Sequence, residues 1–180
     1  MSSEPPVVPE LEKVANSCAH LVTREGVTVH VCAARPGDEA ELSLFFHQVA
    51  PADLRYRFFE TLREVGPDRL SEMTHGAASH TFLARNDAGV LVAVATLSGE
   101  HGAEEAEVAL SVAAEWKHKG ISWTFLEWLL AYAKAEGFKI VSSLEAGENR
   151  EAINLEREMG FIARLTSAAP LEILASKHLG

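Results

Sequence analysis

The chain has 180 residues, of which 47% are hydrophobic and 23% are charged, a composition typical of one soluble globular domain. Its formal net charge of -10 argues against a general nucleic-acid binder or a binder of anionic membranes, because both need a basic face. The N-terminus lacks the basic start and apolar core of a signal peptide, and no apolar run approaches the length of a membrane span. We therefore expect a cytoplasmic protein.

The two cysteines, Cys18 and Cys32, have neither zinc-site spacing nor the density of a disulfide-rich framework. We interpret them as reduced thiols. Histidines such as His75, His80 and His101 are scattered, without a second ligand at the short spacing of a metal site. We therefore expect no metal.

The first half of the chain predicts an arm, a hairpin and three helices. Residues 1–18 contain three prolines and several acids, which favours a flexible arm, and residues 19–180 form a single domain. Alternating apolar residues on both sides of Arg24-Glu25-Gly26 indicate a β-hairpin over residues 20–32. Helical spacing begins after Asp38, and further helices are expected from Leu54 and over residues 67–74.

The second half predicts strands interrupted by two helices. Strands are expected at residues 79–85, 90–97, 106–112, 138–144, 161–165 and 171–174. One helix runs to about Lys134 and is closed near Gly137, and another follows Asn149, whose side chain is expected to cap it. This order favours an α+β, or mixed α/β, domain built on one mixed sheet.

The stretch that follows the strand Ala106–Val112 indicates an anion site. Glu115-Trp116-Lys117-His118-Lys119-Gly120 is a short basic loop with one glycine, and a helix begins directly after it. Unpaired amides and the helix dipole favour phosphate oxygens at such a junction. We expect a phosphate-bearing ligand to bind here.

Two motifs stand out, Lys117-His118-Lys119-Gly120-Ile121-Ser122 and the segment from Asn149 to Phe161. They resemble the motifs Gln/Arg-x-x-Gly-x-Gly/Ala and Asn-x-x-Ala-x-x-Leu-Tyr-x-x-x-Gly-Phe of the GNAT superfamily of acyl-CoA-dependent N-acyltransferases. The resemblance implies a central mixed, mostly antiparallel sheet flanked by helices, with acetyl-CoA as co-substrate. It implies that the donor is bound by Leu110, Val112, Lys117, His118, Lys119, Gly120, Ile121, Ser122 and Asn149.

Within the superfamily, residues 23–59 resemble the acetyltransferase domain of bacterial Pat-type protein-lysine acetyltransferases, which modify acyl-CoA synthetases. Such enzymes use a glutamate in the central strand as general base, and Glu107 matches that place. An amine is mostly protonated near pH 7, so a base is useful. Glu104 or Glu105 reaching in from the loop is an alternative base, and a Glu107 that only faces solvent is another.

The chain also departs from the family pattern. Lys117 replaces Gln or Arg, Ser122 replaces Gly or Ala, and Glu156 replaces the tyrosine that often protonates the leaving thiolate. Position for position, the chain lacks that general acid.

These observations favour an N-acetyltransferase that acts on a primary amine, with a protein lysine as the favoured acceptor and an acyl-CoA synthetase as a possible protein substrate. The alternatives are a small-molecule amine acetyltransferase and a degenerate module that binds acyl-CoA or a partner without turnover. No nucleic acid and no membrane are expected as partners.

Overall fold

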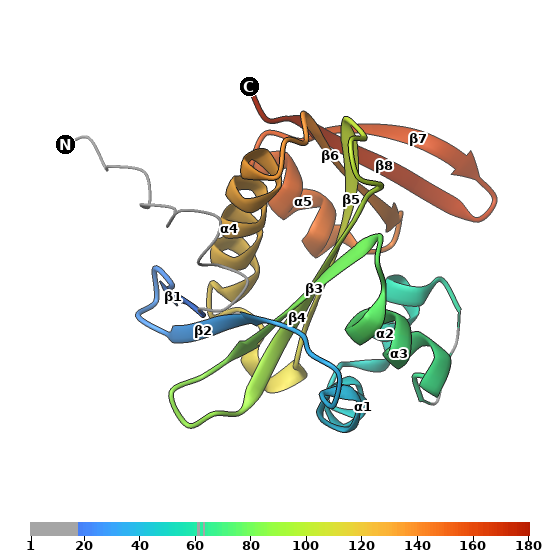
Figure 1. The fold of residues 1–180 in the computed structure, drawn as a ribbon. Helices are drawn as coiled ribbons and strands as arrows, with labels where there is room; N and C mark the ends of the chain where they lie inside the picture. Colours follow the sequence, from blue (N-terminus) through green and yellow to red (C-terminus); the bar gives the residue numbers. More distant parts are fainter. Residues whose placement is uncertain (1–17, 61, 63) are drawn as a thin grey trace.

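The computed structural model describes residues 18–60, 62 and 64–180 (Figure 1). The predicted N-terminal arm, residues 1–18, therefore lies outside the described residues except for Cys18. The helices are α1 (Glu39–His47), α2 (Pro51–Phe58), α3 (Pro67–His75), α4 (Ile121–Ala135) and α5 (Arg150–Glu158), and a short 3-10 turn, η2, covers Ala114–Trp116. The strands are β1 (Ala19–Val22), β2 (Thr28–Ala33), β3 (Ser79–Arg85), β4 (Leu91–Ser98), β5 (Glu105–Val112), β6 (Ile140–Ala146), β7 (Ile162–Ala168) and β8 (Leu171–His178).

The eight strands form one mixed sheet in the order β1-β2-β3-β4-β5-β6-β8-β7. Every neighbouring pair is antiparallel except β5 and β6, which are parallel. The connection between these two strands is α4, the crossover helix that a parallel pair requires. The predicted α+β fold with a mostly antiparallel mixed sheet is confirmed.

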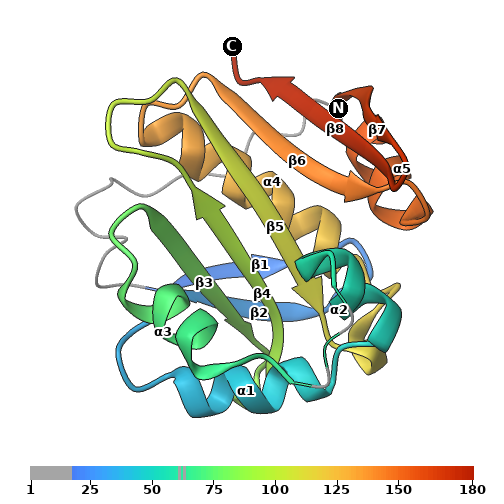
Figure 2. The same cartoon turned by 90° about the vertical axis from the view of Figure 1, so that its right-hand side faces the viewer.

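Helices cover both faces of the sheet, and the strand residues alternate between the two layers (Figures 1 and 2). On β3, Phe82 and Ala84 belong to the core beneath α4, whereas Leu83 belongs to the core beneath α1, α2 and α3. The predicted apolar stripe of α1 is buried through Leu42 and Phe45. Because side chains alternate between the two faces of the sheet, the strands contribute residues to both cores.

The parallel strands β5 and β6 separate partway along their length. Their register contains three pairs, which end at Glu107 opposite Ser142. Beyond this point β5 stays paired with β4 as far as Val112, and β6 stays paired with β8 as far as Ala146. Figure 2 shows the two strands diverging from a common end. The edge of β5 that faces β6 is therefore left without a strand partner along Val108–Val112 in the described structure.

The reduced-thiol interpretation of the cysteines is wrong, because Cys18 and Cys32 form a disulfide. The hairpin register explains the pairing. Ala19 lies opposite Val31, so the residues next to them, Cys18 and Cys32, face each other with their Cα atoms 4.4 Å apart. The two cysteines therefore give no support to the expected cytoplasmic location.

The remaining differences concern the ends of elements. Helix α2 begins at Pro51 rather than at Leu54, because a proline suits the first turn of a helix, where no amide donor is needed. Strand β6 lies two residues later than predicted, and β8 extends to His178 to pair with it. Within the described residues, no helix combines the length and the apolar character that crossing a membrane would require.

Candidate active site

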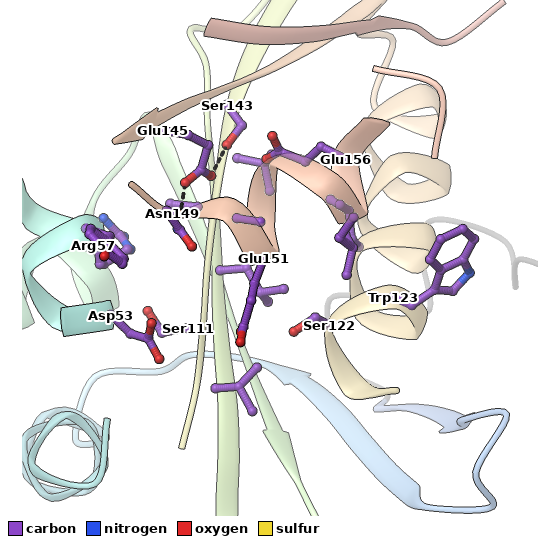
Figure 3. A pocket seen from close by; sticks show the side chains of 18 of the residues that line it. Asp53, Arg57, Ser111, Ser122, Trp123, Ser143, Glu145, Asn149, Glu151 and Glu156 are labelled. Carbon is purple, nitrogen blue, oxygen red and sulfur yellow. Dashed lines mark hydrogen bonds between the residues drawn. The ribbon is translucent and has the colours of Figure 1, made fainter. Parts of the chain in front are cut away.

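A cavity of about 420 Å³ opens where β5 and β6 diverge. Its walls come from β5, β6, the basic loop before α4, and the facing sides of α2 and α5. Figure 3 shows side chains from these elements pointing into it, with Asp53 and Arg57 on one side and Ser122 on the other. The space therefore runs from the basic loop to the fork between the two strands.

The basic loop turns sharply and leaves the start of α4 open. His118 and Gly120 both have positive φ, at 62° and 78°. Gly120 is the N-cap of α4 and supplies no side-chain cap, and the amides of Ile121 and Ser122 have no hydrogen-bond partner among the described residues. Free amides at the positive end of a fifteen-residue helix suit a phosphate group.

Lys117, in the basic loop, forms ion pairs with two walls of the cavity, α2 and α5. Its Nζ lies 2.8 Å from Asp53 Oδ2 on α2 and 3.1 Å from Glu151 Oε2 on α5. Burial opposes the charge, but the hydrogen bonds to the two carboxylates outweigh it and raise the pKa of Lys117. Lys117 therefore links α2 and α5 through its two ion pairs and is not free to bind a phosphate group.

Gly120 also lies against the β1–β2 hairpin. A Cβ atom added at residue 120 would displace the flexible end of the Glu25 side chain and would lie 3.2 Å from Cβ of Thr23, which is a tight contact. The family motif requires glycine here, and the structure supplies two local reasons, the positive φ and this close approach.

Glu107 lies at the fork itself, as the last residue of β5 that pairs with β6. Its side chain is exposed and lines the cavity. Arg57 of α2 reaches the same region, donates a hydrogen bond from Nη2 to Thr96 Oγ1 at 3.3 Å, and interacts electrostatically with Glu107 and Glu145. Burial lowers the pKa of Arg57, and the two carboxylates oppose that effect.

A pair of carboxyl groups lies on the wall formed by β6 and α5. Glu145 comes from β6 and Glu156 from α5, and the two side chains are hydrogen-bonded to each other. Desolvation, followed by the charge of Glu145, raises the pKa of Glu156 to about 8, and desolvation raises the pKa of Glu145. Glu156 is only 4% exposed.

The structure brings most of the predicted site residues to this cavity. Its lining includes Glu107, Leu110, Val112, Lys117, His118, Gly120, Ile121, Ser122 and Asn149, but not Lys119, whose ammonium lies 5.8 Å from the centroid of the Trp116 ring. Asn149 is the N-cap residue of α5, as predicted, but its side chain makes no cap hydrogen bond. Its amide nitrogen donates to Glu145 Oε2 at 2.9 Å instead.

The two alternative bases do not reach the cavity. Glu104 pairs with Lys139 at the surface, and this hydrogen bond lowers the pKa of Glu104. Glu105 is exposed at the start of β5, outside the lining. The sequence analysis missed Arg57 and Glu145. The only sign of their place in the site is that each is a polar residue beside apolar neighbours.

Across the described ranges, no group of three or more His, Cys, Asp or Glu side chains is arranged to hold a metal ion. The lining of the cavity carries carboxyl groups, the Arg57 guanidinium, the Lys117 ammonium and the His118 imidazole.

Comparisons with known proteins agree with this fold. The GNAT domain of S. lividans PAT has 21% sequence identity and a TM-score of 0.83, over 89% of this chain and 96% of that domain. Spermidine N-acetyltransferase from Vibrio cholerae, solved with CoA and spermine, has 19% identity and a TM-score of 0.70, over 84% of this chain and 95% of that one. The cAMP-binding acyltransferase from Mycobacterium smegmatis has 17% identity and a TM-score of 0.62, over 91% of this chain and 48% of that one.

These structures show the shared fold, and they confirm the expected likeness to a Pat-type domain at that level. The family itself is shown by sequence, because the model of the acetyltransferase (GNAT) family matches residues 46–161. Enzymes of this family take their acetyl group from acetyl-CoA. The chain belongs to the GNAT acetyltransferase family.

Proposed function

We propose that this enzyme transfers an acetyl group from acetyl-CoA to a primary amine, with the side chain of a protein lysine as the favoured acceptor. The amine attacks the thioester carbonyl directly, and Glu107 acts as the general base. The observation that carries the proposal is the position of Glu107 at the fork of β5 and β6, where it lines the cavity.

The unpaired edge of β5 supports the proposal that an extended part of acetyl-CoA binds in the fork. Backbone groups along Val108–Val112 face β6 without a strand partner in the described structure, and an extended amide-containing chain can bond to such an edge as an added strand would. The loop before α4 lies at the other end of the cavity, where its amides suit the phosphates of the same ligand. Donor binding thus leaves the thioester end near Glu107.

The charge of the cavity supports a cationic acceptor. Acidic side chains predominate in its lining, namely Asp53, Glu107, Glu145, Glu151, Glu156 and Glu158, against the cations Arg57 and Lys117. An ammonium group is attracted to such a surface before it loses its proton. A lysine has an unperturbed pKa of about 10.4, so a carboxylate at the point of attack is useful near pH 7.

The resemblance to Pat-type domains makes an acyl-CoA synthetase the first protein to try as acceptor. The expected cytoplasmic location is part of this proposal, because both the donor and such a substrate are intracellular.

The test is a transfer assay by mass spectrometry, with acetyl-CoA as donor and three acceptor classes: an acyl-CoA synthetase, spermidine and free amino acids. We expect acetylation of a lysine in the protein acceptor, and a loss of about 100-fold or more in turnover for Glu107→Gln, with unchanged affinity for acetyl-CoA. Glu105→Gln is the matched control, since Glu105 lies two residues earlier on the same strand but outside the cavity.

Full activity of Glu107→Gln would exclude Glu107 as the base. Acetylation of spermidine or an amino acid alone would assign the small-molecule function instead. Binding of acetyl-CoA without transfer to any acceptor would indicate a degenerate binding module.

A further inference from the structure

The Glu145–Glu156 pair has no part in donor binding or in amine deprotonation as proposed above. The two residues come from different elements, β6 and α5, and both line the cavity (Figure 3). Two carboxyl groups in contact cannot both be ionised at low cost, so the pair holds one proton between them. A carboxyl pair of this kind, placed in a cavity, is a candidate acid.

The surroundings show which member keeps the proton. Glu145 accepts a hydrogen bond from Ser143 Oγ at 2.8 Å on Oε1 and another from Asn149 Nδ2 at 2.9 Å on Oε2, and the Arg57 charge acts on it as well. Hydrogen-bond donors and a nearby cation stabilise the ionised form of Glu145. Ser143 acts on Glu156 as well, but Glu156 Oε2 is buried and has no hydrogen-bond partner among the described residues, and burial outweighs the effect of Ser143. The proton therefore resides on Glu156.

The charged groups around the pair come from every neighbouring element. Arg57 on α2 acts on both Glu145 and Glu107, while Glu145 is the charged group that acts on Glu156. On β8, Lys177 donates a hydrogen bond from Nζ to the carbonyl oxygen of Met159 at 2.6 Å. Glu156 thus has a like charge beside it and no cation bound to it, which keeps it protonated at neutral pH.

The transfer reaction needs such a group. When the amine nitrogen bonds to the acetyl carbon and the carbon–sulfur bond breaks, the sulfur departs as a thiolate whose thiol has a pKa of about 8.5. An acid whose own pKa lies close to that value can deliver a proton without a large free-energy change. The pKa of Glu156, about 8, meets this requirement.

We propose that Glu156 is the catalytic acid that protonates the departing thiolate of CoA, and that Glu145 is its positioning residue. The proposal rests on the proposed acetyl transfer. In the balanced step, the nitrogen–carbon bond forms, the carbon–sulfur bond breaks, and the Glu156 proton moves to sulfur. The pair is left doubly ionised and regains one proton from solvent, while the proton lost by the amine leaves through Glu107.

The first test needs no acceptor. Infrared spectra of the wild type between pH 6 and 10 are compared with those of Glu156→Gln. We expect a protonated-carboxyl band in the wild type that disappears with a midpoint near pH 8 and is absent from the variant. A wild type without this band at pH 7 would overturn the proposal.

The second test is the pH profile of kcat with acetyl-CoA and the best acceptor from the transfer assay. We expect Glu156→Gln to lower kcat about 100-fold at pH 7 with an unchanged Kd for acetyl-CoA. Glu156→Tyr should restore most of the rate and move the alkaline fall in kcat toward pH 10, the ordinary pKa of tyrosine. Glu127→Gln is the control, an exposed glutamate on α4 outside the cavity.

Glu145→Gln distinguishes positioning from a structural role. Removing the neighbouring charge makes Glu156 easier to ionise, so the alkaline fall in kcat should begin at a lower pH than in the wild type. A lower kcat with an unmoved pH profile would contradict the role of Glu145. If Glu156→Gln keeps the wild-type kcat in an enzyme that binds acetyl-CoA and transfers the acetyl group, Glu156 is not the catalytic acid and the proposed function stands. If the enzyme fails to bind acetyl-CoA, the proposed function is refuted as well.

Discussion

Replacing Glu156 with glutamine should stabilise the folded protein at alkaline pH and change its stability little near pH 5. Burial beside Glu145 raises the pKa of Glu156 from 4.5 to about 8, so between these values folding takes up a proton. The contribution of Glu156 to stability is fully present below pH 4.5 and is lost as the pH rises through 8. At about 1.4 kcal/mol per pH unit, the loss reaches at most about 5 kcal/mol.

Glutamine has nearly the same shape, stays neutral at every pH, and can donate its amide hydrogen to the Glu145 carboxylate in place of the lost proton. Urea unfolding at pH 5, 6, 7, 8 and 9 measures the free energy of unfolding of both proteins, with Glu127→Gln as the control. The difference between variant and wild type should grow from pH 5 to pH 8 and then level off. A difference that does not change with pH would refute the burial argument.

Three further predictions concern the hairpin, the loop and the core. Cys32→Ser should lower the free energy of unfolding by about 3 kcal/mol, because the disulfide closes a loop with a sequence separation of 14. A reducing agent should lower the free energy of unfolding of the wild type by the same amount. Gly120→Val should weaken acetyl-CoA binding at least about tenfold by calorimetry, since valine is strained at this positive φ and its Cβ would lie 3.2 Å from Cβ of Thr23. Gly102→Val, with a similar φ of 83° but open space around it, should bind acetyl-CoA normally. Leu129→Ala should destabilise the protein by about 2–5 kcal/mol in thermal unfolding, because Leu129 is a fully buried side chain of α4.

Local patterns predicted most of the fold because the burial of each element follows its own periodicity. The alternation in β2 and the apolar stripe of α1 each place residues such as Val29 and Leu42 in the core. The disulfide could also have been found in the sequence. A hairpin centred on Arg24-Glu25-Gly26 pairs residues whose numbers add to 50, which brings Cys18 opposite Cys32.

The carboxyl pair could not be predicted in the same way. Glu145 and Glu156 come from different elements, and their contact depends on how α5 packs against the end of β6. Likewise, Asn149 stands at the N-cap of α5, but its side chain bonds to Glu145 near the end of β6 and caps no helix amide. Sequence spacing describes one element at a time, whereas the acid–base properties of this site arise where several elements meet.

The central claim is that the fork between β5 and β6 binds acetyl-CoA, and calorimetric titration of the purified protein with acetyl-CoA tests it most directly. We predict a Kd in the micromolar range or tighter, about -8 kcal/mol, which Gly120→Val weakens and Gly102→Val does not. No heat of binding up to millimolar acetyl-CoA, in a protein shown to be folded by its cooperative unfolding, would contradict the account.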